Sequence, residues 1–182
     1  IKALDGKNYK LDNDMCVIAD DEKVLGIGGI MGGEYSGSSM ETTEIFLESA
    51  YFDPVQIALA GRKLNIMSDS RYRFERGVDP TYVLEGLEYA TNLIIELCGG
   101  TAEEISVIDN RKFINKKINF NPELVKKMTG LEIENKIISE ILSSLGFKVS
   151  DDWELTVPSW RPDISINEDI VEEVVRIYGL NN

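Results

Sequence analysis

Carboxylates are the most abundant side chains in this sequence that could take part in catalysis or metal binding. The 182 residues include 32 Asp and Glu, 19 Lys and Arg and no histidine, which gives a formal charge of −13. Because histidine is the commonest general base and a frequent metal ligand, hydrolytic chemistry here has to use carboxylates, oriented water or backbone amides. The negative charge also disfavours nonspecific adhesion to phosphate backbones, which depends on clustered Lys and Arg.

Glu48 is the first candidate for a ligand-binding acid, because it ends an apolar β-type run at residues 45–47. In strand alternation its side chain points to the same face as Phe46, and we therefore expect it to point inward. A buried carboxylate costs several kcal/mol unless it is hydrogen-bonded. Two interpretations stay open: Glu48 is kept for a ligand, or it pairs with one of the nearby arginines Arg71, Arg73 and Arg76.

The stretch from Ser68 to Pro80 carries six charges and the aromatic residues Tyr72 and Phe74 between two helix-like segments. A solvated linker needs no such composition, so we interpret the stretch as an ordered crossing that forms part of a site. The short hydroxyls of Ser68 and Ser70 suit a backbone that passes close to a ligand.

A second set of acids lies near the end of the chain. Asp169, Glu172 and Glu173 stand at helical spacing i, i+3 and i+4 and share one helix face, to which Asp163 can fold back. Acids in the first turns of a helix can simply complement the helix dipole. The alternative is a magnesium site, since this ion prefers oxygen ligands with room for water.

Hydrophobic periodicity and turn residues predict the elements that position these side chains. Asp53 before Pro54 is an N-cap followed by proline at the first helical position, and the Asp-Pro pair at 79–80 repeats the pattern. Gly99 ends the second helix. The predicted elements of this part are strands at residues 14–19, 24–30, 44–49 and 105–108 and helices at residues 54–64 and 80–98.

A polar and basic segment at residues 109–117 predicts a domain boundary, and we divide the chain into residues 1–112 and 113–182. Beyond it the pattern restarts in smaller units that resemble a winged-helix plan. The predicted elements are strands at residues 118–120, 147–149 and 154–157, a helix capped by Asn121-Pro122 that ends at Met128, a helix at 134–145 and a last helix from Asn167.

Several other classes of function are disfavoured. No segment approaches the roughly 18 to 20 apolar residues of a membrane span, and the N-terminus lacks the plan of a signal peptide, so we expect a cytoplasmic protein. Cys16 and Cys98 are expected to be buried thiols, with no disulfide or zinc site. The glycine-rich residues 28–37 lack the lysine of a phosphate-binding loop.

Four motifs taken in order resemble the β subunit of bacterial phenylalanine–tRNA ligase over nearly the whole chain. They are IMGGE at residues 30–34, FLESAYFDP at 46–54, YRFERGVDP at 72–80 and PSWRPD at 158–163. The resemblance implies an α+β fold, in which a mixed-sheet portion of the B3/B4 editing module precedes a small winged-helix-like B5 domain.

The resemblance also implies roles for the candidate residues. Glu48 matches the family glutamate that recognises the tyrosine hydroxyl in the editing pocket, and Ser68 and Ser70 match positions that line it, usually a threonine and a small residue. A pocket histidine of the family falls just upstream of this chain, so we expect a fragment with no assignable catalytic residue and no activity alone. The positions that bind magnesium together with the α subunit match Asp163, Asp169, Glu172 and Glu173.

In this family the working enzyme is an (αβ)2 heterotetramer, in which the α subunit catalyses ATP-dependent attachment of phenylalanine to its tRNA. The β subunit binds the aminoacyl end of tRNA(Phe) and hydrolyses mischarged Tyr-tRNA(Phe). The resemblance therefore implies an α-subunit partner, tRNA and Mg²⁺, with ATP used by the holoenzyme and not bound by this fragment. Two alternatives remain, a nucleic-acid-binding module and a purely structural interaction module without editing activity.

Overall fold

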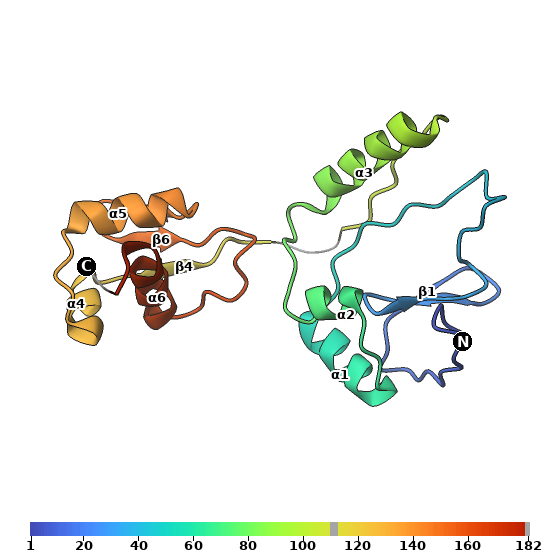
Figure 1. Cartoon of the computed structure of the whole chain (residues 1–182), viewed down its shortest axis with the longest axis horizontal. Helices are drawn as coiled ribbons and strands as arrows, with labels where there is room; N and C mark the ends of the chain where they lie inside the picture. The colour runs from blue at the N-terminus through green and yellow to red at the C-terminus, as the bar shows by residue number, and fades with distance from the viewer. Residues whose placement is uncertain (110–112, 181–182) are drawn as a thin grey trace. The chain divides into compact units, whose positions relative to one another are not determined.

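The computed structural model describes residues 1–109 and 113–180. The chain divides into two compact units, Ile1–Val107 and Ile108–Asn182 (Figure 1). The boundary predicted between residues 112 and 113 adjoins residues 110–112, which lie outside the described residues. The α+β class is confirmed, because each unit combines a small sheet with helices. No described helix has the length and apolar character needed to cross a lipid bilayer.

Unit 1 begins with a three-stranded sheet in the order β1-β2-β3. The strands are β1 (Val17–Ala19), β2 (Val24–Ile27) and β3 (Met31–Gly32), and both pairings are antiparallel. The tight turn between β2 and β3 requires Gly29, whose φ of +66° lies in the left-handed region that favours glycine. This glycine-rich turn shapes one wall of the site described below.

The sheet of unit 1 is followed by two helices that lie next to each other, α1 (Pro54–Leu64) and α2 (Asp69–Phe74) (Figure 1). The predicted cap is confirmed: the Asp53 carboxylate accepts a hydrogen bond from the Gln56 N–H. Ile57 of α1 and Ile27 of β2 belong to one buried cluster. The core of the unit consists of Met15, Ile27, Ile30, Ile57, Ala60 and Ile66, with Phe52 and Phe74 packed against it.

Arg71 of α2 is buried and packs against α1. Its guanidinium donates to the Ile66 carbonyl (2.6 Å) and to Glu75 (2.9 Å). The side chain passes directly over Gly61 of α1, where a Cβ would collide with it. The stretch predicted as a crossing is thus ordered, and it contains a short helix that the sequence reasoning did not predict.

The third helix, α3 (Val83–Cys98), has no buried residue and stands apart from α1 and α2 (Figure 1). It begins at Val83, three residues later than predicted, because Asp79 accepts from the Thr81 N–H in a turn before the helix. Cys98, expected to be buried, is exposed at its end, whereas Cys16 is partly buried.

Two predicted strands of unit 1 were wrong. Residues 44–49 and 105–108 have no regular secondary structure, although both are rich in β-type residues. A strand needs a neighbour for its backbone N–H and C=O groups, and no ladder joins either segment to another described strand. The extended segment 44–52 instead contributes side chains to a cavity.

Unit 2 has a three-stranded antiparallel sheet in the order β4-β6-β5, formed by β4 (Lys117–Asn119), β5 (Lys148–Val149) and β6 (Glu154–Thr156). Three helices, α4 (Glu123–Thr129), α5 (Asn135–Ser144) and α6 (Asn167–Tyr178), follow the predicted ranges closely. The combination of helices with a β-hairpin agrees with the predicted winged-helix plan. Residues from every one of these helices and from β6 form the core, among them Val125, Leu142, Leu155, Ile170 and Val174.

Candidate functional site

An open cavity of 750 Å³ lies in unit 1, between the glycine-rich turn, the segment 44–52 and α2. Its lining includes Glu48 and Ser70, two of the predicted site residues, together with Phe46, Phe52 and Phe74. The structure therefore brings together side chains that are 22 residues apart in the sequence. Such a mixture of apolar walls and a few polar groups is typical of small-ligand sites.

Glu48 lies in this cavity as an exposed residue, and the neighbouring Phe46 is 92% exposed. The expected inward orientation of this segment was wrong, because the segment forms no strand and so has no buried face. The cavity walls nevertheless remove water from the carboxyl, and this desolvation raises the pKa of Glu48. The ionised form of Glu48 is thus less well solvated than that of a free glutamate.

The arginines considered as partners of Glu48 are engaged elsewhere or make no ion pair with it. Arg71 bonds Glu75, and Arg76 bonds Glu75 (3.2 Å) while its guanidinium stacks on the Tyr72 ring at 3.7 Å. Across residues 1–109 and 113–180, no ion pair joins Glu48 to Arg71, Arg73 or Arg76. Within the described residues, the cavity therefore holds a carboxylate that forms no ion pair with these arginines.

Ser68 is not part of the cavity lining, although it helps to build the wall. It is the N-cap of α2, where its hydroxyl oxygen accepts from the Arg71 N–H (3.1 Å). The same hydroxyl donates to the carbonyl of Ile30 (2.6 Å), in the turn that borders the cavity. Ser68 thus fixes the start of α2 to the glycine-rich turn and holds Ser70 of the first helical turn at the cavity.

Two aromatic residues of the cavity were not among the predicted site residues, although Phe74 lies in the stretch expected to form part of a site. Phe52 and Phe74 meet edge to face with ring centroids 5.1 Å apart, and both line the cavity. Their rings give it an apolar surface that suits an aromatic ligand. The available signal was position, since Phe52 lies four residues after Glu48 and Phe74 four residues after Ser70.

Cys16 lies behind the glycine-rich turn, where its carbonyl accepts from the Gly28 N–H (3.0 Å). Burial, and to a smaller degree the charge of Glu48, raise the pKa of the Cys16 thiol. A raised pKa keeps the sulfur protonated and unreactive. The interpretation of Cys16 as a small apolar side chain agrees with this environment.

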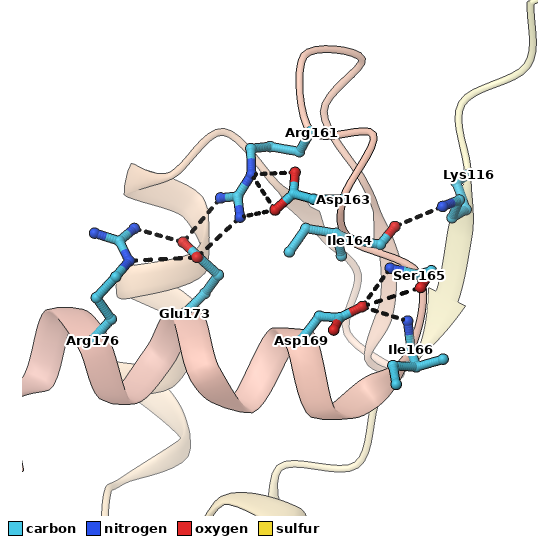
Figure 2. A network of polar contacts seen from close by, with 9 residues as sticks. All are labelled: Lys116, Arg161, Asp163, Ile164, Ser165, Ile166, Asp169, Glu173 and Arg176. Atoms are coloured by element: carbon cyan, nitrogen blue, oxygen red, sulfur yellow. Dashed lines mark hydrogen bonds and ion pairs between the residues drawn. The ribbon is translucent and has the colours of Figure 1, made fainter. Parts of the chain in front are cut away.

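The predicted acids of unit 2 belong to a network of polar contacts (Figure 2). Arg161 binds the Asp163 carboxylate through Nε (2.9 Å) and Nη2 (2.6 Å) and also binds Glu173 (2.9 Å), while Arg176 binds Glu173 from α6 itself (2.6 Å). Arg161 and then Arg176 lower the pKa of Glu173 to about 2, and Arg161 lowers that of Asp163. These two carboxylates remain ionised and paired.

The other two acids are arranged differently. Asp169 accepts from the Ser165 N–H (2.7 Å) and the Ile166 N–H (3.0 Å), which lowers its pKa and caps the start of α6. Glu172 is exposed and borders an apolar groove with Met128 and Val175. In the part of the chain that the structure describes, no group of three acidic, histidine or cysteine side chains could hold a metal ion. As arranged here, these acids do not fit Mg²⁺.

Comparison with known proteins gives both units a family. Residues 1–99 match the family model of the B3/4 domain, and residues 118–180 match that of the tRNA synthetase B5 domain. The chain is 50% identical over 182 residues to the phenylalanine–tRNA ligase β subunit of Rhodopseudomonas palustris. The match covers 98% of the chain and 23% of that relative.

The chain belongs to the family of phenylalanine–tRNA ligase β subunits. Other β subunits of this ligase agree: that of Mesorhizobium japonicum is 46% identical over 185 residues, which is 100% of the chain and 23% of the relative. That of Wolbachia from Brugia malayi is 43% identical over 180 residues, or 97% of the chain and 23% of the relative. The chain thus spans about a quarter of the length of these β subunits. Glu48 and Ser70 lie in the B3/4 match, and the arginine–carboxylate network lies in the B5 match.

Proposed function

We propose that the cavity at Glu48 is the editing pocket in which the ligase hydrolyses tyrosine mischarged onto tRNA(Phe). The observation that carries this proposal is a desolvated carboxylate that lines an aromatic cavity and has no ion pair with an arginine of residues 1–109 and 113–180. A carboxylate in that state has lost part of its hydration, and a ligand hydroxyl can restore a hydrogen bond to it.

The discrimination required of the ligase explains why such a pocket is needed. An apolar site shaped for phenylalanine rejects an added hydroxyl by only about 10²-fold, whereas a site that hydrogen-bonds the hydroxyl rejects the analogue without it by about 10⁴- to 10⁵-fold. Glu48 would accept the phenolic O–H, and Phe52 and Phe74 would supply the apolar walls. Ser70 is small and leaves room for the ring. Hydrolysis would then rely on water held in the pocket, and no side chain of this chain is assigned as a base.

The wider role proposed for the chain is that of a β-subunit segment in an (αβ)2 ligase of the cytoplasm. The α subunit would catalyse ATP-dependent charging, unit 1 would receive the aminoacyl end of tRNA(Phe), and unit 2 would take part in subunit packing. This role is supported by the likeness to β subunits of the ligase at 43–50% identity.

Magnesium at Asp163, Asp169, Glu172 and Glu173 stays a prediction. In the arrangement described above these side chains are paired with arginines, cap a helix or face solvent, so no step of the proposed function involves the ion. Mg²⁺ titration of the assembled ligase carrying Asp169→Ala, with direct measurement of bound metal, tests it; unchanged metal content would exclude Asp169 as a ligand.

The proposal is tested by hydrolysis of Tyr-tRNA(Phe) and Phe-tRNA(Phe) in an assembled ligase whose β subunit carries this segment. Glu48→Ala should lower the ratio of the two rates by about 10- to 10²-fold, because a hydrogen bond to a charged group contributes about 1.5–3 kcal/mol. Glu41→Ala, an exposed acid outside the cavity lining, is the matched control. Phenylalanine charging should be unchanged in both variants. A Glu48→Ala enzyme with the parental ratio would refute the role of Glu48.

A second candidate function is a general nucleic-acid-binding module. The observation that favours it is the winged-helix plan of unit 2. The charge of −13 argues against it. Binding of duplex DNA and tRNA to the chain at several salt concentrations separates the two functions, since phosphate contacts give a steep fall of affinity with salt.

A further inference from the structure

Arg161 joins the middle of the segment between β6 and α6 to helix α6 (Figure 2). Its guanidinium lies between Asp163 of the same segment and Glu173 in the second turn of α6. Nη2 binds Asp163 Oδ2 at 2.6 Å and Glu173 Oε1 at 3.0 Å, and Nη1 binds Glu173 Oε2 at 2.9 Å. Only 21% of the Arg161 side chain and 9% of that of Glu173 are exposed.

Further contacts hold the same segment at its other end. The Ile164 carbonyl accepts from Lys116 Nζ at 2.7 Å, next to β4. Asp169 accepts from the N–H groups of Ser165 and Ile166. Between these anchors the side chain of Ile164 is buried in the core of the unit, so the position of the segment matters for packing.

The charges within this cluster are already balanced. Asp163 and Glu173 contribute two negative charges, and Arg161 and Arg176 contribute two positive ones. Mg²⁺ requires near-octahedral oxygen ligands that are free to bind it. The oxygens that face Arg161 here accept hydrogen bonds from nitrogen, and a cation between them would meet a guanidinium of the same sign.

We infer that Arg161 is the counter-ion that fastens the segment 157–166 to α6, and that unit 2 reaches its folded state without magnesium. The planar fork of a guanidinium suits this role, because it can bind two carboxylates at once in fixed directions. A lysine would supply a single point charge and could not reproduce the paired contacts.

Thermal unfolding of the 182-residue chain tests the inference, and tryptophan fluorescence reports on unit 2 because both tryptophans, Trp153 and Trp160, lie in it. The midpoint of the wild-type chain should be the same in EDTA and in millimolar MgCl2. Arg161→Met should lower it by roughly 5–10 °C, the shift expected in a unit of this size for the loss of a partly buried network. Arg161→Lys should recover only part of this loss.

Lys117→Met is the matched control, since Lys117 makes an exposed ion pair with Glu154 in the same unit. Removal of an exposed pair should shift the midpoint by less than about 3 °C. A wild-type midpoint that rises with Mg²⁺ and falls with EDTA would overturn the inference. So would an Arg161→Met shift no larger than that of Lys117→Met.

A second measurement does not depend on whether the variant folds. In the NMR spectrum of the wild-type chain, the Arg161 Nε–H bonded to Asp163 should exchange slowly with water and keep its chemical shift as Mg²⁺ is added. Loss or movement of that signal at millimolar Mg²⁺ would show that the ion displaces the guanidinium, and would contradict the inference.

Discussion

In unit 2, Glu173 is buried and bonded by two arginines, whereas in unit 1 Glu48 lies in an open cavity and forms no ion pair with any arginine that the structure describes. The arginines hold the pKa of Glu173 at about 2, while desolvation raises the pKa of Glu48. The comparison of Glu173 with Glu48 shows that burial of an acid does not by itself indicate a functional role. A desolvated carboxylate with no counter-ion among the described residues is the property on which the proposal for Glu48 rests.

The two units also differ in how completely their helices and loops are packed into a hydrophobic core. In unit 2 every helix contributes buried side chains to one cluster. In unit 1 the cluster is smaller, α3 buries none of its residues, and the segment 44–52 lines a cavity without regular secondary structure. Unit 2 therefore has the larger single core, and unit 1 has the open cavity at Glu48.

Removing core volume from unit 2 should have the largest effect on stability. Leu155 is fully buried, and Leu155→Ala should lower the free energy of unfolding by about 2–5 kcal/mol through lost burial and the cavity left behind. Leu84→Ala on α3, where Leu84 is 43% exposed, should change it by less than about 1 kcal/mol. Chemical denaturation followed by tryptophan fluorescence for the first variant, and by circular dichroism for the second, checks the contrast. Equal losses would remove the distinction between the two cores.

Acid should weaken unit 2 through Glu173. Its folded-state pKa of about 2 lies below the usual 4.5, so its contribution is complete above about pH 4.5 and is lost as the pH falls toward 2. At 1.36 kcal/mol for each pKa unit, the loss is at most about 3 kcal/mol. The facing groups are Arg161 and Arg176, which stay charged throughout, and Asp163, whose pKa is lowered in the same direction.

Equilibrium unfolding followed by tryptophan fluorescence at a series of pH values measures this loss. Glu173→Gln should be less stable than the parent at neutral pH and should show a shallower dependence on pH in the acid range. An unchanged slope in Glu173→Gln would mean that other carboxylates, such as Asp163 and Asp169, dominate the acid response.

A pair of glycines in unit 1 distinguishes packing from helix propensity. Gly61→Ala places a Cβ against the buried Arg71 and should destabilise the unit by about 1–3 kcal/mol, despite the higher helix propensity of alanine. In α3, a Cβ on Gly86 meets only the Tyr82 ring at an ordinary 3.4 Å, so Gly86→Ala should stabilise that helix by up to about 1 kcal/mol. Hydrogen exchange of amides in α1 and α3 reports each effect separately. Opposite signs are expected, and equal signs would contradict the account.

The smallest expected effect is on the stability of unit 1 in Glu48→Gln. Because a raised pKa means that folding disfavours the ionised form, removal of the charge should stabilise unit 1 slightly at neutral pH. Hydrogen exchange in α1 and α2 measures the change. A clear destabilisation would show that Glu48 has a structural role like that of Glu173.

The sequence predicted elements well where local chemistry decides them. The Asp53-Pro54 pair correctly predicted the start of α1. Apolar periodicity correctly predicted α5 and the start of α6. The strand predicted at residues 44–49 failed because pairing depends on a neighbour that composition does not reveal. The start of α3 failed because Asp79 forms a turn before the helix instead of capping it.

The candidate site was predictable only in part, for two physical reasons. Glu48 and Ser70 were found through motifs, but the role of Ser68 as the cap of α2 follows from its contacts with Arg71 and Ile30, which are tertiary information. For unit 2, helical spacing grouped the acids correctly on α6. It could not show that Arg161, 12 residues before Glu173, reaches across to bind it.

The central claim is that Glu48 serves editing and Glu173 serves stability. The most direct test measures hydrolysis and thermal stability in a variant of each acid. Glu48→Ala and Glu173→Ala are compared in an assembled ligase for hydrolysis of Tyr-tRNA(Phe) and in the 182-residue chain for thermal stability. Glu48→Ala should lose hydrolysis by about 10- to 10²-fold with unchanged stability, whereas Glu173→Ala should lose stability while hydrolysis at permissive temperature persists. Parental hydrolysis in Glu48→Ala would contradict the central claim.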